Sequence, residues 1–322
     1  MLAAASRLTY YSAPMQRAAR PRRRGYPFVV TLLVLGTAGL ASFRGGAFHG
    51  LAQAEPRIRT SPVGDRAVAE PSERRLLAAL HPNADVVSKE QQALAHFAAL
   101  GLPIYCGGPD HPFVALTFDD GPGPYTKTTL QILANAGAPA TFFLVGRNLQ
   151  YWPDLPRREL AAGALGDHTW THRDMRGATA QELYDEIDRT RQGIGQASGT
   201  SPGLFRPPLG ARDQALETYL QARAMVDVIW SVDSRDSDGA TPQEVLANVT
   251  AGLRPGAIVL MHENRGSTLS MLPQIMAAVR ASGLRPVTVP YLLAYDPPSE
   301  EQVRSHACGT PAPVASASAS AT

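Results

Sequence analysis

The amino-acid sequence predicts an α/β fold, a barrel of about seven parallel strands with helices outside it. From residue 113 onward, short apolar runs alternate with helical segments, a pattern typical of a parallel sheet. The strands are short and their number is close to eight, which favours a barrel over an open sheet. Titratable side chains follow several of the apolar runs. Because active sites of such barrels form at the carboxyl ends of the strands, we expect the functional site there.

Each expected element is a short apolar run or a helical stretch. The expected strands are 113–118, 140–145, 164–168, 203–206, 226–232, 257–262 and 287–290. The expected helices between them are 126–136, 155–162, 179–196, 212–223, 242–252 and 268–281. Ser88 and Gln91 match a capping box, which predicts an earlier helix that opens there, stops at Gly101 and packs on the main domain.

Composition and charge limit the classes of protein to which the chain can belong. The chain has 322 residues, 44% of them hydrophobic and 18% charged, which is ordinary for a globular protein with a sizeable core. The net charge of +2 gives no basis for a nucleic-acid partner. Neither of the two cysteines lies in a Cys-x-x-Cys pair, which argues against a cysteine-based zinc site.

The N-terminal region resembles an export or membrane-insertion signal. Residues 1–25 are basic and contain no acid, and the apolar run 26–43 follows them. A run of this length fits either a signal peptide or a signal anchor. The arginine excess predicts a cytoplasmic N-terminus and places the remaining chain outside. We therefore expect a protein anchored in the membrane through 26–43 with its main domain extracellular, or a secreted protein; the alternative is a buried core helix.

The rest of the chain divides into three parts. Residues 44–104 are expected to form a proline-containing linker and then the N-terminal helical segment. The main domain is expected over 105–297. The C-terminal tail 298–322 is expected to be largely disordered, because from Thr310 onward it contains only Thr, Ala, Ser, Pro and Val.

Cys106 and Cys308 are predicted to form a disulfide. They are the two cysteines of the chain, and thiols oxidise outside the cytoplasm. Cys106 precedes the first expected strand and Cys308 follows the last, and these two strands are neighbours in a closed barrel. The alternative is a small buried hydrophobe at Cys106 and a free thiol at Cys308 in a mobile tail.

Two adjacent carboxylates, Asp119 and Asp120, follow an apolar run and precede the turn Gly121-Pro122. Neighbouring side chains at a strand end can point into one site. One carboxylate could then bind a metal ion while the other acts as a general base. The alternative is an ordinary turn, since turns favour these residue types.

His168 and His172 are four residues apart. On one turn of helix this spacing places both imidazoles on the same face, where they can bind one metal ion. Asp120 would complete a set of three ligands and leave coordination positions open, as in catalytic rather than structural zinc sites. Two histidines at this spacing also arise by chance, so the pair alone does not define a site.

Three further strand ends carry titratable side chains. Arg206 is followed by Pro-Pro-Leu-Gly, a stiff loop that could hold the guanidinium against a carboxylate and direct a backbone N–H at the reaction. The alternative is a rigid surface turn. Asp233 and Asp236 follow the fifth expected strand, and His262 ends the sixth. A histidine at such a place is often structural, but several titratable strand ends in one domain favour function.

The order of these motifs resembles one family. TFDDGP, HTWTH, RPPLG, DSRD and LMHE follow one another within residues 105–295, as in the polysaccharide deacetylase family (carbohydrate esterase family 4, NodB homology domain). The resemblance implies a distorted (β/α) barrel. It also implies an enzyme that uses a divalent metal ion to remove N-acetyl groups from chitin, chito-oligosaccharides or peptidoglycan, or O-acetyl groups from xylan.

The resemblance implies a role for each of these residues. Asp119 corresponds to the general base and Arg206 to the residue that steers it. His262 corresponds to the general acid, and Asp236 would tune it. The implied reaction is hydrolysis of a carbon–nitrogen bond other than a peptide bond.

The resemblance also implies the metal and substrate contacts. Asp120, His168 and His172 correspond to the ligands of one divalent ion, for which we expect Zn²⁺, with Co²⁺ and Ni²⁺ as alternatives. The backbone N–H of Leu209 would stabilise the oxyanion. Leu260 would line the pocket for the acetyl methyl group.

The sequence departs from the family pattern at three positions. Leu209 stands where an aromatic residue is usual, and Ser237 stands where tryptophan is common, which would open the pocket and weaken stacking on the sugar. Asp167 replaces a common asparagine, and the segment 162–166 before it is one residue short. None of these changes removes a reacting group, so we expect activity.

We therefore expect a deacetylase that acts on an extracellular N-acetylglucosamine-containing glycan, either peptidoglycan or a chitin-type oligosaccharide. The alternatives are an acetylxylan O-esterase on the same scaffold and a non-catalytic, membrane-tethered glycan-binding module. The complete set of ligands and base argues against the second alternative. The expected partners are the glycan polymer and, through 26–43, the membrane; we expect a monomer that binds no nucleic acid.

Overall fold

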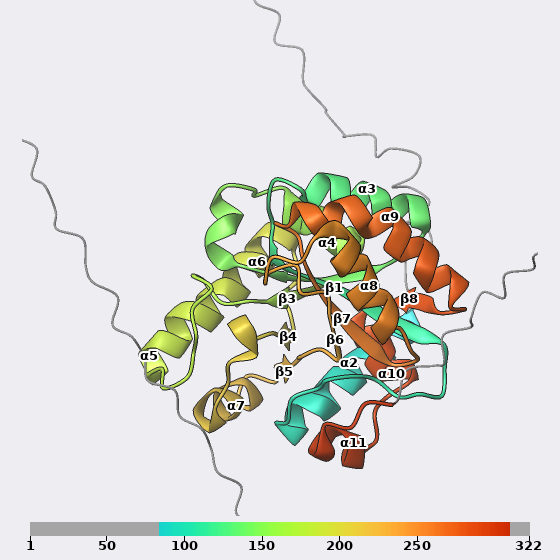
Figure 1. Cartoon of the computed structure of the whole chain (residues 1–322). Helices are drawn as coiled ribbons and strands as arrows, with labels where there is room; N and C mark the ends of the chain where they lie inside the picture. The colour runs from blue at the N-terminus through green and yellow to red at the C-terminus, as the bar shows by residue number, and fades with distance from the viewer. Residues whose placement is uncertain (1–83, 310–322) are drawn as a thin grey trace, which may run out of the picture. The chain divides into compact units, whose positions relative to one another are not determined.

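The computed structural model describes residues 84–309, which form a parallel sheet of eight strands with helices around it (Figure 1). The strands are β1 (Phe113–Gly121), β2 (Ala140–Leu144), β3 (Gly163–Asp167), β4 (Leu204–Phe205), β5 (Val226–Asp227), β6 (Val232–Asp233), β7 (Ala257–His262) and β8 (Arg285–Val287). Their order is β5-β4-β3-β2-β1-β7-β6, and β8 pairs with the first residues of β1. This curled parallel sheet confirms the predicted fold class.

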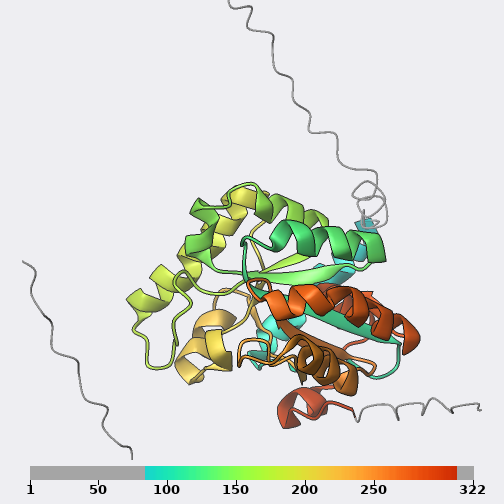
Figure 2. The same cartoon turned by 45° about the horizontal axis from the view of Figure 1, so that its top comes forward.

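The helices cover the outside of the sheet (Figures 1 and 2). The longer ones are α2 (Ala84–Leu100), α3 (Thr126–Ala136), α4 (Leu155–Ala161), α6 (Arg189–Ser198), α7 (Gln214–Gln221), α8 (Pro242–Gly252), α9 (Gly266–Ala281) and α10 (Val289–Tyr295). Two of them, α3 and α8, have the bounds predicted from the sequence. Short 3₁₀ turns, η1 (Gly146–Gln150) and η3 (Pro208–Gly210), follow β2 and β4.

β1 lies at the centre of the sheet, between β2 and β7. Its side chains alternate between two hydrophobic clusters. Val114, Leu116 and Phe118 belong to one cluster, and Ala115 belongs to the other. A strand that is covered on both faces needs a continuous apolar run. That run ends at Asp119, so the first acidic side chains of the strand appear at the carboxyl edge of the sheet.

The predicted strand 226–232 is divided into β5 and β6, so the prediction is wrong for its middle part. β5 pairs with β4, whereas β6 pairs with β7 at the other end of the strand order. The carbonyl groups between β5 and β6 bind a side chain. Those of Val228 and Ile229 each accept a hydrogen bond of 3.0 Å from the guanidinium of Arg206, and the segment turns at this point.

The predicted helix 179–196 is interrupted by a π-helical turn. The structure contains α5 (Ala180–Leu183), the π turn η2 (Tyr184–Asp188) and then α6. Such turns occur frequently at functional sites. The buried side chain of Glu186 comes from this turn.

α2 begins at Ala84, so Ser88 lies inside the helix and the predicted start at a capping box is wrong. The hydroxyl of Ser88 instead accepts a hydrogen bond of 3.2 Å from the side chain of Gln92, one turn later. Phe97 and Leu94 pack against the cluster that also contains Ala115. The helix therefore packs on the barrel through one apolar stripe.

The end of the chain is more ordered than predicted. β8 pairs with the start of β1, and α11 (Glu300–Ser305) follows α10 with a capping box formed by Ser299 and Gln302. The prediction of a largely disordered tail from residue 298 is therefore wrong for 298–309. The rest of that tail, 310–322, lies outside the described residues.

The predicted basic segment 1–25, the apolar segment 26–43 and the linker as far as residue 83 also lie outside the described residues. Within residues 84–309, no helix is both long enough and apolar enough to cross a membrane. The membrane topology and the location of the protein therefore stay predictions.

A disulfide joins Cys106 to Cys308, with the Cα atoms 5.9 Å apart. It closes a loop across a sequence separation of 202 residues. Because closing a loop restricts the unfolded chain, replacing both cysteines by serine is expected to lower the free energy of unfolding by about 2–4 kcal/mol. Equilibrium urea unfolding measures the change. The reduced wild-type protein should show the same loss, and an unchanged unfolding midpoint in both samples would contradict the prediction.

Candidate active site

Several strand ends meet at the carboxyl edge of the sheet. Asp119 of β1 lies opposite His262 of β7 in the strand register. His168 follows β3, and Arg206 follows β4. The structure thus brings together side chains that the sequence placed at separate strand ends. Each is positioned by a buried strand, which fixes where the backbone of that residue lies.

Asp119 and Arg206 form a buried ion pair. Nη1 of Arg206 donates to Oδ1 of Asp119 at 2.7 Å and to the hydroxyl of Thr117 at 2.7 Å. Arg206 is fully buried, and its remaining donors bind the carbonyls of Val228 and Ile229. These hydrogen bonds fix the orientation of the guanidinium. The guanidinium in turn fixes the orientation of the Asp119 carboxylate.

Asp120, His168 and His172 present three ligand atoms to one point. Nε2 of His172 lies 3.2 Å from Oδ1 of Asp120, and Nε2 of His168 lies 3.8 Å from the same oxygen. All three donor atoms lie within 4.8 Å of one another. Tetrahedral zinc with bonds of about 2.0–2.1 Å requires ligand atoms roughly 3.3 Å apart. Two imidazoles and one carboxylate are a donor set that suits a zinc ion, and the separations of 3.2 Å and 3.8 Å from Oδ1 of Asp120 lie near this value.

The segment from His168 to His172 is a loop, so the prediction that one helical turn aligns the two imidazoles is wrong. Thr169 and His172 have left-handed backbone conformations, with φ of 64° and 60°. The N–H of His172 donates to the hydroxyl of Thr169 at 3.0 Å. This tight loop, rather than a helix, brings the two ring centroids to within 4.9 Å.

Glu186 holds this loop from the side of the π turn. Its two carboxylate oxygens accept from the N–H of Thr171 at 2.8 Å and from the hydroxyl of Thr171 at 2.7 Å. Thr171 directly precedes the ligand His172. The sequence analysis missed Glu186, because a helical pattern does not show where a π turn shifts the side chains.

His168 is held in the tautomer that a metal ligand needs. Its Nδ1 lies 2.7 Å from the carbonyl oxygen of Arg206. Because a carbonyl only accepts, Nδ1 carries the proton and Nε2 has a free lone pair. Burial lowers the pKa of His168, although the charges of Asp119 and Asp120 oppose this. The ring is therefore neutral near pH 7.

His262 and Asp236 form a second buried pair. Nδ1 of His262 lies 2.6 Å from Oδ1 of Asp236, and the N–H of His262 donates to Oδ2 at 2.8 Å. The hydroxyl of Thr268 donates to the same carboxylate. Burial alone would lower the pKa of His262, but the hydrogen bond and charge of Asp236 outweigh it and raise the pKa above the ordinary value. A proton-carrying imidazole suits a general acid.

Asp120 is fixed by two asparagine side chains that the sequence analysis did not single out. Nδ2 of Asn148 donates to the backbone carbonyl of Asp120 at 2.9 Å. Nδ2 of Asn264 donates to its carboxylate oxygen Oδ2 at 3.0 Å. The backbone of Asp120 is left-handed, with φ of 69°, a conformation that non-glycine residues adopt only where their surroundings hold it.

The residues predicted to contact the substrate differ in how exposed they are. Leu209 in η3 has a left-handed backbone, and its side chain is 76% exposed. Leu260 is buried in β7, two residues before His262. Ser237 is exposed beside Asp236. Leu209 therefore presents an exposed apolar side chain on this loop.

Asp167 is the last residue of β3 and directly precedes His168. It is buried at the end of β3, and its Oδ1 accepts from the N–H of Thr169 at 2.9 Å. Burial raises its pKa well above the ordinary value. The register between β3 and β2 is continuous from Gly163 to Asp167, so the shorter preceding segment leaves the strand intact.

Glu159 and Glu263 form a buried acidic pair behind the Asp119–Asp120 turn. A Cβ atom on Gly121 would lie 2.7 Å from Oε1 of Glu263 and 3.1 Å from Oε1 of Glu159, so a larger residue there would have to displace a glutamate side chain. Burial raises the pKa of Glu263 to about 7. Burial also raises the pKa of Glu159, and the charge of Glu263 adds to this. Burial therefore favours the protonated form of both carboxyl groups in the folded protein.

The free energy of unfolding is expected to fall as the pH rises from about 4.5 through about 7, because the folded pair binds more protons than the unfolded chain in this window. Glu159→Gln removes one of the two carboxyl groups and should therefore make this fall smaller. Denaturant unfolding of the metal-free protein at pH 4.5 and pH 8 measures both slopes. Equal slopes in variant and wild type would contradict the prediction.

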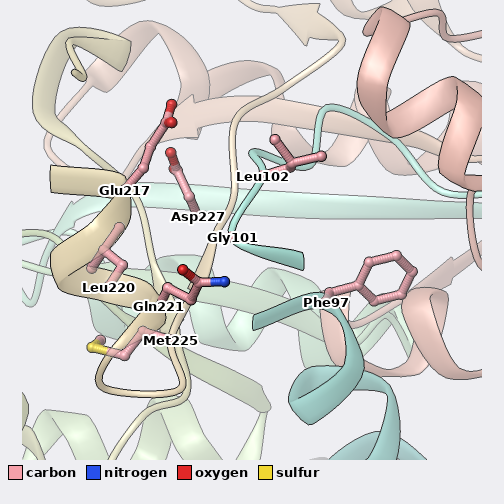
Figure 3. Close-up of a pocket in the computed structure, with 8 residues that line it drawn as sticks. All are labelled: Phe97, Gly101, Leu102, Glu217, Leu220, Gln221, Met225 and Asp227. Atoms are coloured by element: carbon pink, nitrogen blue, oxygen red, sulfur yellow. The ribbon is translucent and has the colours of Figure 1, made fainter. Parts of the chain in front are cut away.

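A small cavity beside α2, α7 and β5 is lined by other residues (Figure 3). They are Phe97, Gly101, Leu102, Glu217, Leu220, Gln221, Met225 and Asp227. Asp227 is buried there, and burial raises its pKa to about 7 although Arg212 opposes this. Because none of the lining residues belongs to the candidate site, we assign the cavity no part in the reaction.

The chain is similar in sequence to known proteins. The polysaccharide deacetylase family model matches residues 107–226. The chain is 38% identical over 176 residues to a bifunctional xylanase/xylan deacetylase of Cellvibrio japonicus, over 54% of this chain and 26% of that protein. It is 33% identical over 198 residues to a chitooligosaccharide deacetylase of Rhizobium leguminosarum bv. trifolii, over 61% of this chain and 89% of that protein.

The chain is also similar in fold to a solved structure. The Bc1960 peptidoglycan N-acetylglucosamine deacetylase superposes with a TM-score of 0.57 at 29% sequence identity. The superposition covers 59% of this chain and 92% of that one. The chain spans only about a quarter of the Cellvibrio protein, so the likeness there concerns one part of a longer enzyme.

Proposed function

Because the chain belongs to the polysaccharide deacetylase family, we propose that it hydrolyses N-acetyl groups of an N-acetylglucosamine-containing glycan with the help of one divalent metal ion. One observation carries the proposal: a three-donor cluster lies next to two buried charge pairs, Asp119 with Arg206 and His262 with Asp236. The first pair offers a base and the second an acid, as amide hydrolysis requires.

The residues of this chain then take different roles in the reaction. Asp119, held by Arg206, accepts a proton from the water that attacks the acetyl carbon. The backbone N–H of Leu209 donates to the oxygen that becomes negatively charged. His262 gives its proton to the nitrogen as the carbon–nitrogen bond breaks, so acetate and a free amine are the products. Leu260 lines the space for the methyl group.

Asp120, His168 and His172 would hold the metal ion, and zinc suits a donor set of two imidazoles and one carboxylate. Such an ion supplies Lewis-acid polarisation of an oxygen atom and lowers the pKa of water. We keep Co²⁺ and Ni²⁺ as alternatives, because imidazole and carboxylate ligands accept both.

Peptidoglycan or a chitin-type oligosaccharide is the proposed substrate. A relative named chitooligosaccharide deacetylase and the structural neighbour named peptidoglycan N-acetylglucosamine deacetylase support this class. We propose that the domain acts outside the cytoplasm as a monomer, tethered through 26–43 or secreted, on the basis of the arginine-flanked apolar segment.

O-deacetylation of xylan is the second candidate, because one relative is a xylan deacetylase. An alcohol leaves more readily than an amine, so an esterase depends less on His262. Acetate release from peptidoglycan, chitin oligomers and acetylxylan, measured side by side, separates the two activities. Faster turnover of acetylxylan, with His262→Ala harmless, would contradict the N-deacetylase proposal. Glycan binding without acetate release from any substrate would favour a non-catalytic module.

A further inference from the structure

The two carboxylate oxygens of Asp120 have different surroundings. Oδ1 lies 3.2 Å from Nε2 of His172 and 3.8 Å from Nε2 of His168. Oδ2 accepts the hydrogen bond from the side-chain amide of Asn264. Oδ1 therefore faces the two imidazole nitrogens, whereas Oδ2 accepts a hydrogen bond from a neutral donor.

Asn264 is placed for this contact by the strand that carries the general acid. It is the second residue after His262, the last residue of β7. β7 and β1 run in continuous register as far as Asp119 and His262, and the N–H of Glu263 donates to the carbonyl of Asp119 at 2.9 Å. The backbones on either side of the Asn264–Asp120 contact are therefore fixed relative to each other.

The second asparagine has a different function. Asn148 binds the backbone carbonyl of Asp120 and so holds the left-handed peptide. It does not touch the carboxylate in this contact, so the side-chain torsions of Asp120 are left to other groups. Asn264 is the neutral donor that fixes which oxygen turns toward the histidines.

We propose that Asn264 is a positioning residue for the metal site: by holding Oδ2, it makes Asp120 bind the metal ion through Oδ1 alone. A carboxylate that used both oxygens would occupy a coordination position that water and substrate need. The inference rests on the proposed function, because it requires that Asp120, His168 and His172 bind a metal ion. Hydrogen-bonded partners of metal ligands typically contribute 10–100-fold to metal affinity.

If the hydrogen bond between Asn264 and Asp120 were an ordinary surface contact, its removal would not affect metal binding. Asn264 is exposed, and a solvent-exposed hydrogen bond contributes little to folding. Asn264→Leu, which has a similar shape and no donor, should therefore leave the unfolding of the metal-free protein unchanged. A positioning role predicts that the same variant binds Zn²⁺ about tenfold to a hundredfold more weakly.

The test is a Zn²⁺ titration of the folded protein against a competing chelator at one fixed pH. Asn264→Leu should show the weaker binding, and Asn264→Gln, which keeps an amide donor, should recover most of the affinity. Asn135→Leu is the matched control, because Asn135 is an exposed asparagine of α3 whose side chain accepts from Gln131. It should bind Zn²⁺ as the wild type does.

The outcomes separate the inference from the proposed function. If the wild type binds one Zn²⁺ and releases acetate but Asn264→Leu keeps wild-type affinity, the inference is wrong and the proposed function stands. Equal weakening in Asn264→Leu and Asn264→Gln would also overturn it, because the donor would not be the cause. A wild-type protein that binds no Zn²⁺, Co²⁺ or Ni²⁺ would overturn both.

Discussion

Asp119→Asn is expected to lower the rate of acetate release by about two to four orders of magnitude, the usual contribution of a general base. The amide cannot take the proton of the attacking water. Its oxygen can still accept the hydrogen bond that Arg206 now makes to Asp119 at 2.7 Å, so the surrounding structure should remain. Because Asp119 is not a ligand in this account, the variant should keep its metal ion.

Two measurements on the same sample test this prediction. Initial rates of acetate release from an N-acetylated oligosaccharide give the loss of activity, and metal analysis gives the occupancy. His262→Ala serves as a comparison, because it should affect amide substrates more strongly than ester substrates. An Asp119→Asn protein that loses the metal together with activity would identify Asp119 as a ligand and contradict the assignment.

Arg206→Met is expected to lower the free energy of unfolding by about 3–5 kcal/mol, as is usual when one partner of a buried ion pair is removed. The change leaves the carboxylate of Asp119 buried without its guanidinium. It also leaves the carbonyls of Val228 and Ile229 without the donors that they have now. Equilibrium denaturant unfolding of the metal-free protein measures the loss.

The surface offers a matched control for this variant. Arg223 and Asp188 form an ion pair at 2.7 Å, the same distance as the pair of Arg206 and Asp119, but both side chains are partly exposed. Arg223→Met should therefore cost only about 1 kcal/mol or less. Adding Asp119→Asn to Arg206→Met should recover part of the loss, because no uncompensated charge then remains. Equal costs for the two arginine variants would contradict the role given to burial.

The sequence was sufficient to predict the parallel sheet and the residues at its carboxyl edge. β1 is recognisable because a strand covered on both faces must be apolar until it ends, and it ends at Asp119. The same argument located His262 after the apolar run of β7. The geometry between strands could not be read in this way, because register and pairing depend on the whole sheet.

The wrong predictions have local causes that the hydrophobic pattern does not show. At the split between β5 and β6, side-chain donors of Arg206 bind two backbone carbonyls. The loop from His168 to His172 depends on two left-handed residues that are not glycine. α11 depends on its cap at Ser299, within a tail whose composition suggested disorder.

Two of the missed residues, Glu186 and Asn264, contact the segments of the candidate ligands from parts of the chain that are distant in the sequence. Neither lies in an apolar run or beside a metal ligand in the chain. An asparagine two positions after a histidine has no distinctive pattern. Only the placement of β7 against β1 shows that Asn264 reaches the carboxylate of Asp120.

The central claim is that Asp120, His168 and His172 hold one metal ion on which deacetylation depends. The most direct test measures zinc content and acetate release in the wild type and in the double variant His168→Ala, His172→Ala. We expect about one metal ion per wild-type chain and acetate release from an N-acetylglucosamine oligosaccharide, and neither in the double variant. Full metal occupancy or undiminished acetate release in the double variant would contradict the account.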